Sequence, residues 1–281
     1  MLSLIATALL ALPSALASPV QLPFHSTASP SSTRLVPVAL GVMSKCPDAM
    51  LCENVWDRVL ETRVGGAGGV LVPGGGGGGA GGGKEGDVPR GEVSEFVSME
   101  LVYIGRENKT ATHGVTCMHG DSECVGNMQQ LCAAKHWTPA DAASRHEGED
   151  DELRAQLRGK QGWEDWWNFV QCMNYGDRSR IGSESAAKEC ARVAKRDWNE
   201  SVASCVAGKE GRHLLLSSVR RAHKLGATKS CTVLIEDKPV CVHDGTWKEC
   251  PAGHEVGDFV REVKESWVKL NVGGKAEEMG V

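Results

Sequence analysis

Cysteines are the residues of this chain best suited to chemistry, and Cys46 has the most suggestive position among the eleven. It follows a short apolar run, Leu35 to Met43, and precedes Pro47 and apolar residues at helical spacing, so it is predicted to lie where a strand turns into a helix. Backbone N–H groups and the partial positive charge of a helix N-terminus stabilise a thiolate. Because the thiolate is the attacking species in disulfide exchange, Cys46 is predicted to be a nucleophile.

A second arrangement is the segment 117–132, which contains three cysteines spaced C-x6-C-x7-C. On one continuous helix Cys124 and Cys132 would lie about 12 Å apart along the axis, whereas a disulfide requires Cα atoms within about 7 Å. Each cysteine therefore needs a partner elsewhere. A zinc site with His119 as a ligand is the competing interpretation, but zinc ligands usually come in closely spaced pairs that this segment lacks. The spacing favours structural disulfides, with no metal and with His119 as a structural residue.

The same segment resembles the signature of the gamma-interferon-inducible lysosomal thiol reductase (GILT) family, Cys-x-His-Gly-x-x-x-Cys-x-x-Asn-x-x-x-x-Cys. The fixed positions are all occupied, by Cys117, His119, Gly120, Cys124, Asn127 and Cys132. The resemblance implies a thioredoxin-like fold in which the signature follows the second strand. It also implies that Cys46 is the attacking cysteine of a reductase of protein disulfides, with an external thiol as reductant and no cofactor.

Two positions depart from the family pattern. Ala49 stands where a Cys-x-x-Cys would place the resolving thiol, which leaves three alternatives for Cys46. It acts as a monothiol, it uses Cys52 after local unwinding, or it forms a structural bridge with Cys52. Ser230 and Cys231 stand near the place of the cis-proline that thioredoxin-like proteins set against the active cysteine, which makes Cys231 a further candidate for the resolving thiol. The odd cysteine count favours the monothiol, because the other ten can form five bridges.

The N-terminus and the composition indicate the secretory pathway. Residues 1–17 are an apolar run ending in Ala15-Leu16-Ala17, the form of a signal-peptidase site, and are too short to span a bilayer. Eleven cysteines suit an oxidising compartment, and Asn108 and Asn199 begin glycosylation sequons. We therefore expect a secreted protein or one of the lysosomal or vacuolar lumen, with no membrane span after signal removal. A net charge of -5 without a basic cluster argues against nucleic acid as a partner.

The order of predicted elements gives the fold class. A strand at 35–43, a helix that includes 50–60 and a strand at 97–104 form a βαβ half; strands at 231–235 and 240–242, turning at 236–239, and a helix over 256–267 form a ββα half. Residues 187–205 form one apolar helical stripe within a mainly helical insertion. The prediction is an α/β, thioredoxin-like fold with a helical insertion between the βαβ and ββα halves.

The predicted domain covers residues 34–270. Its boundaries are set by composition, because Ser/Pro-rich and Gly-rich stretches gain too little from burial to offset their ordering entropy. Outside or within it we expect a disordered lead-in at 18–33, a flexible Gly-rich insertion at 64–91, the mainly helical insertion at 133–226, and a flexible tail at 271–281. The alternative to an enzyme is a non-catalytic, disulfide-stapled binding or structural domain that has kept this fold and lost the Cys-x-x-Cys chemistry.

Overall fold

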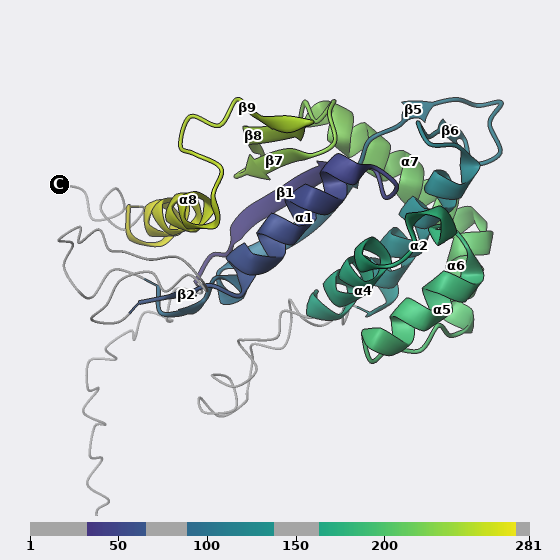
Figure 1. Ribbon diagram of the computed structural model, residues 1–281, viewed down its shortest axis with the longest axis horizontal. Coiled ribbons are helices and arrows are strands. Elements are labelled where there is room, and N and C mark those ends of the chain that lie inside the picture. Colours follow the sequence, from purple (N-terminus) through teal and green to yellow (C-terminus); the bar gives the residue numbers. More distant parts are fainter. Residues whose placement is uncertain (1–32, 66–88, 138–162, 274–281) are drawn as a thin grey trace, which may run out of the picture. The chain divides into compact units, whose positions relative to one another are not determined.

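The computed structural model describes residues 33–65, 89–137 and 163–273 (Figure 1). The predicted signal peptide at 1–17 lies outside these residues, as do all but the last residue of the lead-in, most of the Gly-rich insertion and most of the tail. Among the described helices, none has the length and the apolar character needed to cross a membrane.

A five-stranded sheet with the order β4-β1-β7-β8-β9 forms the centre of the described chain. The strand β1 (Val36–Val42) pairs in parallel with β4 (Val97–Tyr103) and antiparallel with β7 (Thr232–Ile235). Two further antiparallel strands, β8 (Lys238–Asp244) and β9 (Thr246–Lys248), continue the sheet. The predicted α/β class is confirmed. The strand β9 was not predicted, because its three residues, Thr-Trp-Lys, are too few to show a periodic pattern.

Helices cover both faces of this sheet (Figure 1). The helices α1 (Pro47–Leu60) and α8 (Val256–Val268) pack on one face, where the rings of Trp56 and Phe259 lie 5.3 Å apart. The helix α7 (Lys209–Lys224) packs on the other. Side chains alternate along a strand, so Leu40 of β1 faces the α1 side while Ala39 faces α7. The strands β1 and β7 are therefore largely buried on both faces, which positions the junction between β1 and α1.

In the sequence, more helices lie between β4 and β7. These are α2 (Asp121–Trp137), α4 (Glu164–Tyr175), α5 (Glu184–Val193) and α6 (Glu200–Ala207). The single apolar stripe predicted over residues 187–205 belongs to two helices, because the chain breaks after α5 at Lys195, whose φ is +56°. Asn199 then starts α6 by accepting a hydrogen bond from the Val202 N–H.

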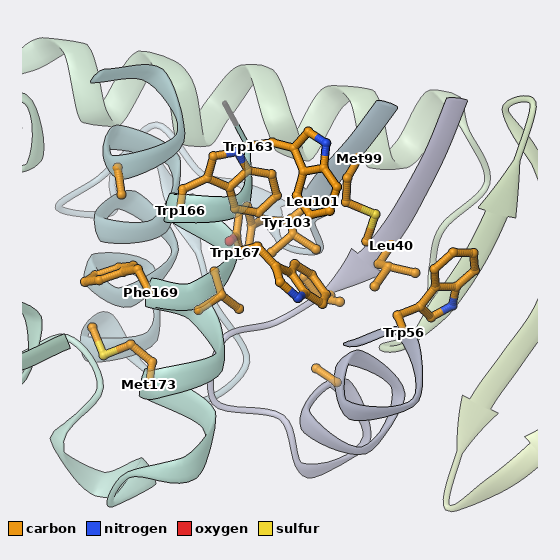
Figure 2. Packing of buried hydrophobic residues seen from close by; sticks show 14 of the residues in the cluster. Leu40, Trp56, Met99, Leu101, Tyr103, Trp163, Trp166, Trp167, Phe169 and Met173 are labelled. Carbon is orange, nitrogen blue, oxygen red and sulfur yellow. The ribbon is translucent and has the colours of Figure 1, made fainter. Parts of the chain in front are cut away.

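The helix α4 contributes aromatic side chains to the main core. Figure 2 shows Trp163, Trp166 and Trp167 gathered beside Tyr103 of β4, in the same buried cluster as Leu40. The indole Nε1 of Trp167 donates to Asp57 of α1 at 2.8 Å. Residues 163–175 are therefore joined to α1 and to the sheet by core packing.

The smaller elements complete the described chain. The strands β2 (Arg63–Val64) and β3 (Gly91–Glu92) pair with each other, as do β5 (Arg106–Glu107) and β6 (Val115–Thr116). There are two short 3-10 turns, η1 (Val93–Glu95) and η2 (Arg178–Arg180). The π-helical turn η3 (Lys269–Gly273) includes Asn271, whose side chain bonds to the backbone of Arg34 and of Trp267.

Candidate active site

Cys46 is the N-cap residue of α1, with the extended backbone angles of a cap and Pro47 as the first helical residue. Proline suits this position because its missing N–H has no partner there and its fixed φ fits the helix. The Cys46 N–H donates to the Met43 carbonyl at 2.9 Å, which closes the turn out of β1. The residue is buried, with 6% of its surface exposed. Its Sγ lies 3.8 Å from the Ser230 carbonyl oxygen and 4.0 Å from Asp48 Oδ2.

All eleven cysteines lie among the described residues, and Cys46 is the free one. Cys124 and Cys132 do not pair with each other, as their spacing on one helix predicted; each has another partner. The five bridges are Cys52–Cys231, Cys117–Cys124, Cys132–Cys205, Cys172–Cys190 and Cys241–Cys250. The structural disulfides expected for the signature are therefore present.

The predicted alternative of a Cys46–Cys52 bridge is wrong, because Cys52 is bonded to Cys231. The helix α1 begins at Pro47 and runs without interruption through Cys52, so the two sulfurs are separated by several residues of helix. Cys52 and Cys231 are both fully buried. Neither is a free thiol in this state, so neither resolves a mixed disulfide at Cys46 until their bridge opens.

The backbone at Ser230 forms one wall beside the Cys46 sulfur. In addition to the carbonyl contact, Ser230 Oγ accepts a hydrogen bond from the Met43 N–H at 3.0 Å. The Ser230–Cys231 peptide bond is cis. The hydrogen bond between Met43 and Ser230 joins the end of β1 to the start of β7. Residues 230–231 lie close to Cys46, as predicted.

The signature segment 117–132 lies directly against the loop that leads to Cys46. Glu123, on the first turn of α2, is fully buried, and its carboxylate accepts from the Lys45 N–H at 3.3 Å and from the His119 N–H at 3.2 Å. The His119 Nδ1 also contacts this carboxylate. Asn127 Oδ1 accepts from the Ser44 N–H at 3.1 Å. Two successive backbone N–H groups before Cys46 are thus held by side chains of the signature helix.

The turn into that helix is fixed by covalent and backbone features. The Cys117–Cys124 bridge closes the segment that contains His119 and Gly120. Gly120 has a φ of +86°, a conformation that residues with a side chain rarely adopt. Sequence reasoning identified these residues but not Glu123, although its place four residues after His119 puts it within reach on the following turn.

Asp48 and His243 lie on the other side of Cys46. Asp48, in the first turn of α1, accepts from the Gly245 N–H through Oδ1 at 2.9 Å. The same oxygen lies 2.7 Å from Nδ1 of His243 on β8, although the ring N–H is not aligned for a hydrogen bond of ordinary geometry. His243 is buried, with the edge of its ring against Trp247. Sequence reasoning missed this pair, because its members are far apart in the chain and share no motif.

Comparison with known proteins supports the assignment suggested by the signature. Residues 88–194 match the family model described as "Gamma interferon inducible lysosomal thiol reductase (GILT)". Part of this chain is similar to the GILT family. A curated relative from Anopheles gambiae, "Gamma-interferon-inducible lysosomal thiol reductase-like protein", is 27% identical over 128 residues, which are 44% of this chain and 46% of the relative. The chain therefore matches about half the length of that relative, and Cys46 precedes the segment matched by the family model.

The two sequons of this chain lie in different settings. Asn199 is exposed and is the N-cap of α6. Asn108 is half-buried, and its Nδ2 donates to Thr116 Oγ1 at 3.0 Å. Both side chains are therefore engaged in local hydrogen bonds.

One set of potential metal ligands comes together within the described residues, namely His136, Cys205 and Glu210. The sulfur of Cys205 is bonded to Cys132 and offers no thiolate. Glu210 is paired with Lys135 at 2.6 Å. The set therefore lacks the ligand chemistry of a zinc site.

Proposed function

We propose that this protein is a thiol–disulfide oxidoreductase in which the Cys46 thiolate attacks a disulfide of a protein substrate. The observation that carries the proposal is a free cysteine at the N-terminus of α1 in a chain whose ten other cysteines are paired. A helix N-terminus favours the thiolate form, and the thiolate is the nucleophile of disulfide exchange. The match of residues 88–194 to the GILT family model supports the same chemistry.

The fold that we propose for this site is thioredoxin-like. Support comes from the strand order β4-β1-β7-β8, with β4 parallel to β1 and with β7 and β8 antiparallel, and from α1 and α8, which pack on one face. The helices between β4 and β7 would be the helical insertion. The site itself, rather than the fold, carries the functional argument.

The reaction that we propose has three exchange steps. Cys46 first forms a mixed disulfide with one substrate sulfur, and the electron pair of the substrate S–S bond leaves with the other sulfur. An external thiol then attacks the Cys46 sulfur and releases the second substrate thiol, and another external thiol frees Cys46 and leaves with the first as a disulfide. An external thiol fits the state described here because Cys52 and Cys231 are bonded to each other. After reduction of that bridge, Cys231 or Cys52 would become the resolving thiol instead.

The compartment and the partners are part of the same proposal. Five disulfides are typical of a protein of the secretory pathway. We place the chain in the lumen of a lysosome or vacuole or outside the cell, after removal of residues 1–17, with glycans at Asn108 and Asn199. Its partners are disulfide-containing proteins and a thiol reductant.

Labelling and turnover of the intact protein test the proposal. Iodoacetamide under non-reducing conditions should modify Cys46, mapped by mass spectrometry, and Cys46→Ser should lose both the label and the reduction of a disulfide peptide by free cysteine. The Cys52→Ser/Cys231→Ser double variant should keep turnover if the external thiol resolves. Loss of turnover in the double variant, with the mixed disulfide trapped at Cys46, would show that the internal pair resolves instead.

A second function, a non-catalytic disulfide-stapled domain, is favoured by two observations. Cys46 has only 6% of its surface exposed, and Ala49 occupies the position of a second active-site cysteine. For this function Cys46 would be a buried core residue, inert like other buried thiols. It predicts no labelling of Cys46 in the folded protein and equal background turnover for wild type and Cys46→Ser.

A further inference from the structure

The pair formed by Asp48 and His243 has the position of a proton acceptor and donor for Cys46. Asp48 Oδ2 lies 4.0 Å from the Cys46 Sγ, while its other oxygen lies 2.7 Å from His243 Nδ1. One carboxylate thus faces the reacting sulfur with one oxygen and a buried imidazole with the other. The Gly245 N–H fixes the carboxylate at 2.9 Å.

The burial of His243 gives the pair its second, independent support. The imidazole has 7% of its surface exposed, and its Nδ1 makes no hydrogen bond of ordinary geometry although it points at Asp48. A buried polar atom without a partner is costly, so such an atom in a native fold calls for an explanation. A role in which Nδ1 gains and loses a proton toward Asp48 accounts for it.

Other charged side chains near Cys46 and His243 have different partners and do not contact both residues. Asp244 of β8 is paired with Lys229 at 2.7 Å and with Lys248 of β9 at 3.2 Å, all at exposed positions. The ring of Trp247 contacts both His243 and His254. The His254 ring stacks on the Trp247 ring with their centroids 5.6 Å apart, whereas the His243 and Trp247 rings meet edge to face. Lys45, next to Cys46, directs its Nζ toward Ser122 instead. Asp48 is therefore the charged side chain in contact with both the sulfur and the imidazole.

We propose that Asp48 is a catalytic residue, with His243 behind it, that takes the Cys46 thiol proton and returns it to the leaving sulfur of the substrate. This inference rests on the proposed function. In the first step the proton passes from Cys46 through Asp48 to His243, which becomes an imidazolium beside the Asp48 carboxylate. The Cys46 sulfur then forms its bond to one substrate sulfur, and the S–S electron pair leaves with the other sulfur, which takes the proton back.

The geometry of exchange brings the leaving sulfur within reach. The attacking and leaving sulfurs lie in line on either side of the attacked sulfur, so they are about 4 Å apart, twice the length of an S–S bond. A carboxyl group in contact with the attacking sulfur is therefore placed near the leaving sulfur as well. Proton return matters most when the leaving thiolate is basic, because a basic thiolate leaves slowly without an acid.

The test compares two disulfide reagents that differ in the need for this proton. Bis(2-hydroxyethyl) disulfide releases a basic alkyl thiolate, whereas 5,5′-dithiobis(2-nitrobenzoate) releases an acidic aryl thiolate that leaves unprotonated. In Asp48→Asn and His243→Gln, loss of the proton acceptor should lower the rates with both reagents. Loss of proton return should lower the rate with the alkyl reagent at least about tenfold more than the rate with the aryl reagent. Asp48→Asn retains an oxygen that accepts from Gly245, and Asp244→Asn is the matched control.

The outcomes separate this inference from the proposed function. A loss that is at least about tenfold larger with the alkyl reagent supports the proton relay, because a merely structural defect would lower both rates by the same factor. Equal losses with both reagents, or no loss, overturn the relay. If Cys46→Ser reacts with either reagent as fast as wild type, the proposed function itself fails, independently of Asp48. Near-ultraviolet circular dichroism of each variant shows whether the fold is retained.

Discussion

The helices α1 and α2 both have a cysteine near the N-terminus and a buried glutamate, but these residues have different partners in the two helices. Each end has a cysteine, Cys46 or Cys124, and each helix has a buried glutamate, Glu53 or Glu123. At α2 the cysteine is bridged and the glutamate is surrounded by donors from the chain. At α1 the cysteine is free and Glu53 has one amide partner, Asn174 at 2.7 Å. The signature end is thus locked, and it holds the reactive end in place.

The difference between the two helices shows that the reactivity of a cysteine sulfur depends on the residues around it. Cys124 is silent because Cys117 lies within bonding distance, with Cα atoms 5.6 Å apart. Cys46 keeps its thiol because Cys52, the nearest cysteine in sequence, is bonded to Cys231 across the core.

Replacement of Glu53 should change the pH dependence of stability. Burial raises the pKa of Glu53 from 4.5 to about 8, and the Asn174 hydrogen bond offsets only part of this rise. Because the folded-state pKa is higher, this group destabilises the fold increasingly from pH 4.5 to about pH 8 and not below that range. At about 1.4 kcal/mol per pH unit the full effect is at most about 5 kcal/mol. Glu53→Gln should therefore raise the unfolding free energy at pH 8.5 far more than at pH 4.5.

Urea unfolding of wild type and Glu53→Gln at the two pH values measures this difference. Glutamine keeps an oxygen that accepts from Asn174, so the substitution removes the ionisation and little else. Glu265→Gln, at an exposed position of α8, is a matched control. Parallel stability curves for wild type and Glu53→Gln would show that Glu53 does not titrate in this range.

Replacement of Glu123 should loosen the reactive end from the locked one. Glu123→Ala removes the acceptor for the Lys45 and His119 N–H groups, which leaves two partly buried donors unsatisfied, and should cost about 2 to 3 kcal/mol. It should also speed alkylation of Cys46 severalfold, because the loop before Cys46 loses one of its two side-chain anchors. Glu123→Gln, which keeps one acceptor, should show smaller effects. Unchanged labelling in Glu123→Ala would mean that the signature does not position Cys46.

Removal of the signature bridge should lower stability without adding reactivity at Cys46 beyond that of Glu123→Ala. The bridge joins residues seven apart, for which the chain-entropy relation gives about 2.5 kcal/mol. The Cys117→Ala/Cys124→Ala double variant should show this loss in urea unfolding. The Cys172→Ala/Cys190→Ala variant, with a separation of 18, is the control for a bridge remote from the signature. A double variant as stable as wild type would contradict the entropic account.

The smallest effect is expected at the first residue of α1. Pro47→Ala releases the fixed φ of the chain in its unfolded state and should cost about 0.5 to 1 kcal/mol. Cys46 should label at nearly the wild-type rate, because its neighbours at Ser230 and Asp48 are unchanged. A labelling rate altered more than about threefold would assign Pro47 a direct influence on the sulfur.

Much of the framework was predictable because it is local. The apolar run before Cys46 gave β1 within a residue at either end, and the spacing of Val55, Trp56 and Val59 gave α1. The hairpin of β7 and β8 was also expected, although its turn is tighter than predicted, at Glu236 and Asp237 with positive φ. The break between α5 and α6 was not expected, because one apolar stripe continues through both helices.

The candidate site was predictable only in part. Cys46 and the signature positions are identified by neighbours close in sequence, such as Pro47 or Gly120. The contacts of Glu123 with Lys45 and of Asp48 with His243 join segments that are distant in the chain. No periodicity or motif records such contacts, since they arise only when α1, α2 and β8 pack around the sheet.

Composition and short-range spacing were enough to predict an apolar strand that turns into a helix at Cys46, a chain rich in cysteines, and a segment that resembles the GILT signature. The bond between Cys52 and Cys231, 179 residues away, could not be read from such local patterns, and it leaves Cys46 free. A disulfide forms only between Cα atoms within about 7 Å, and for residues so distant in the chain that proximity arises from the packing of the core.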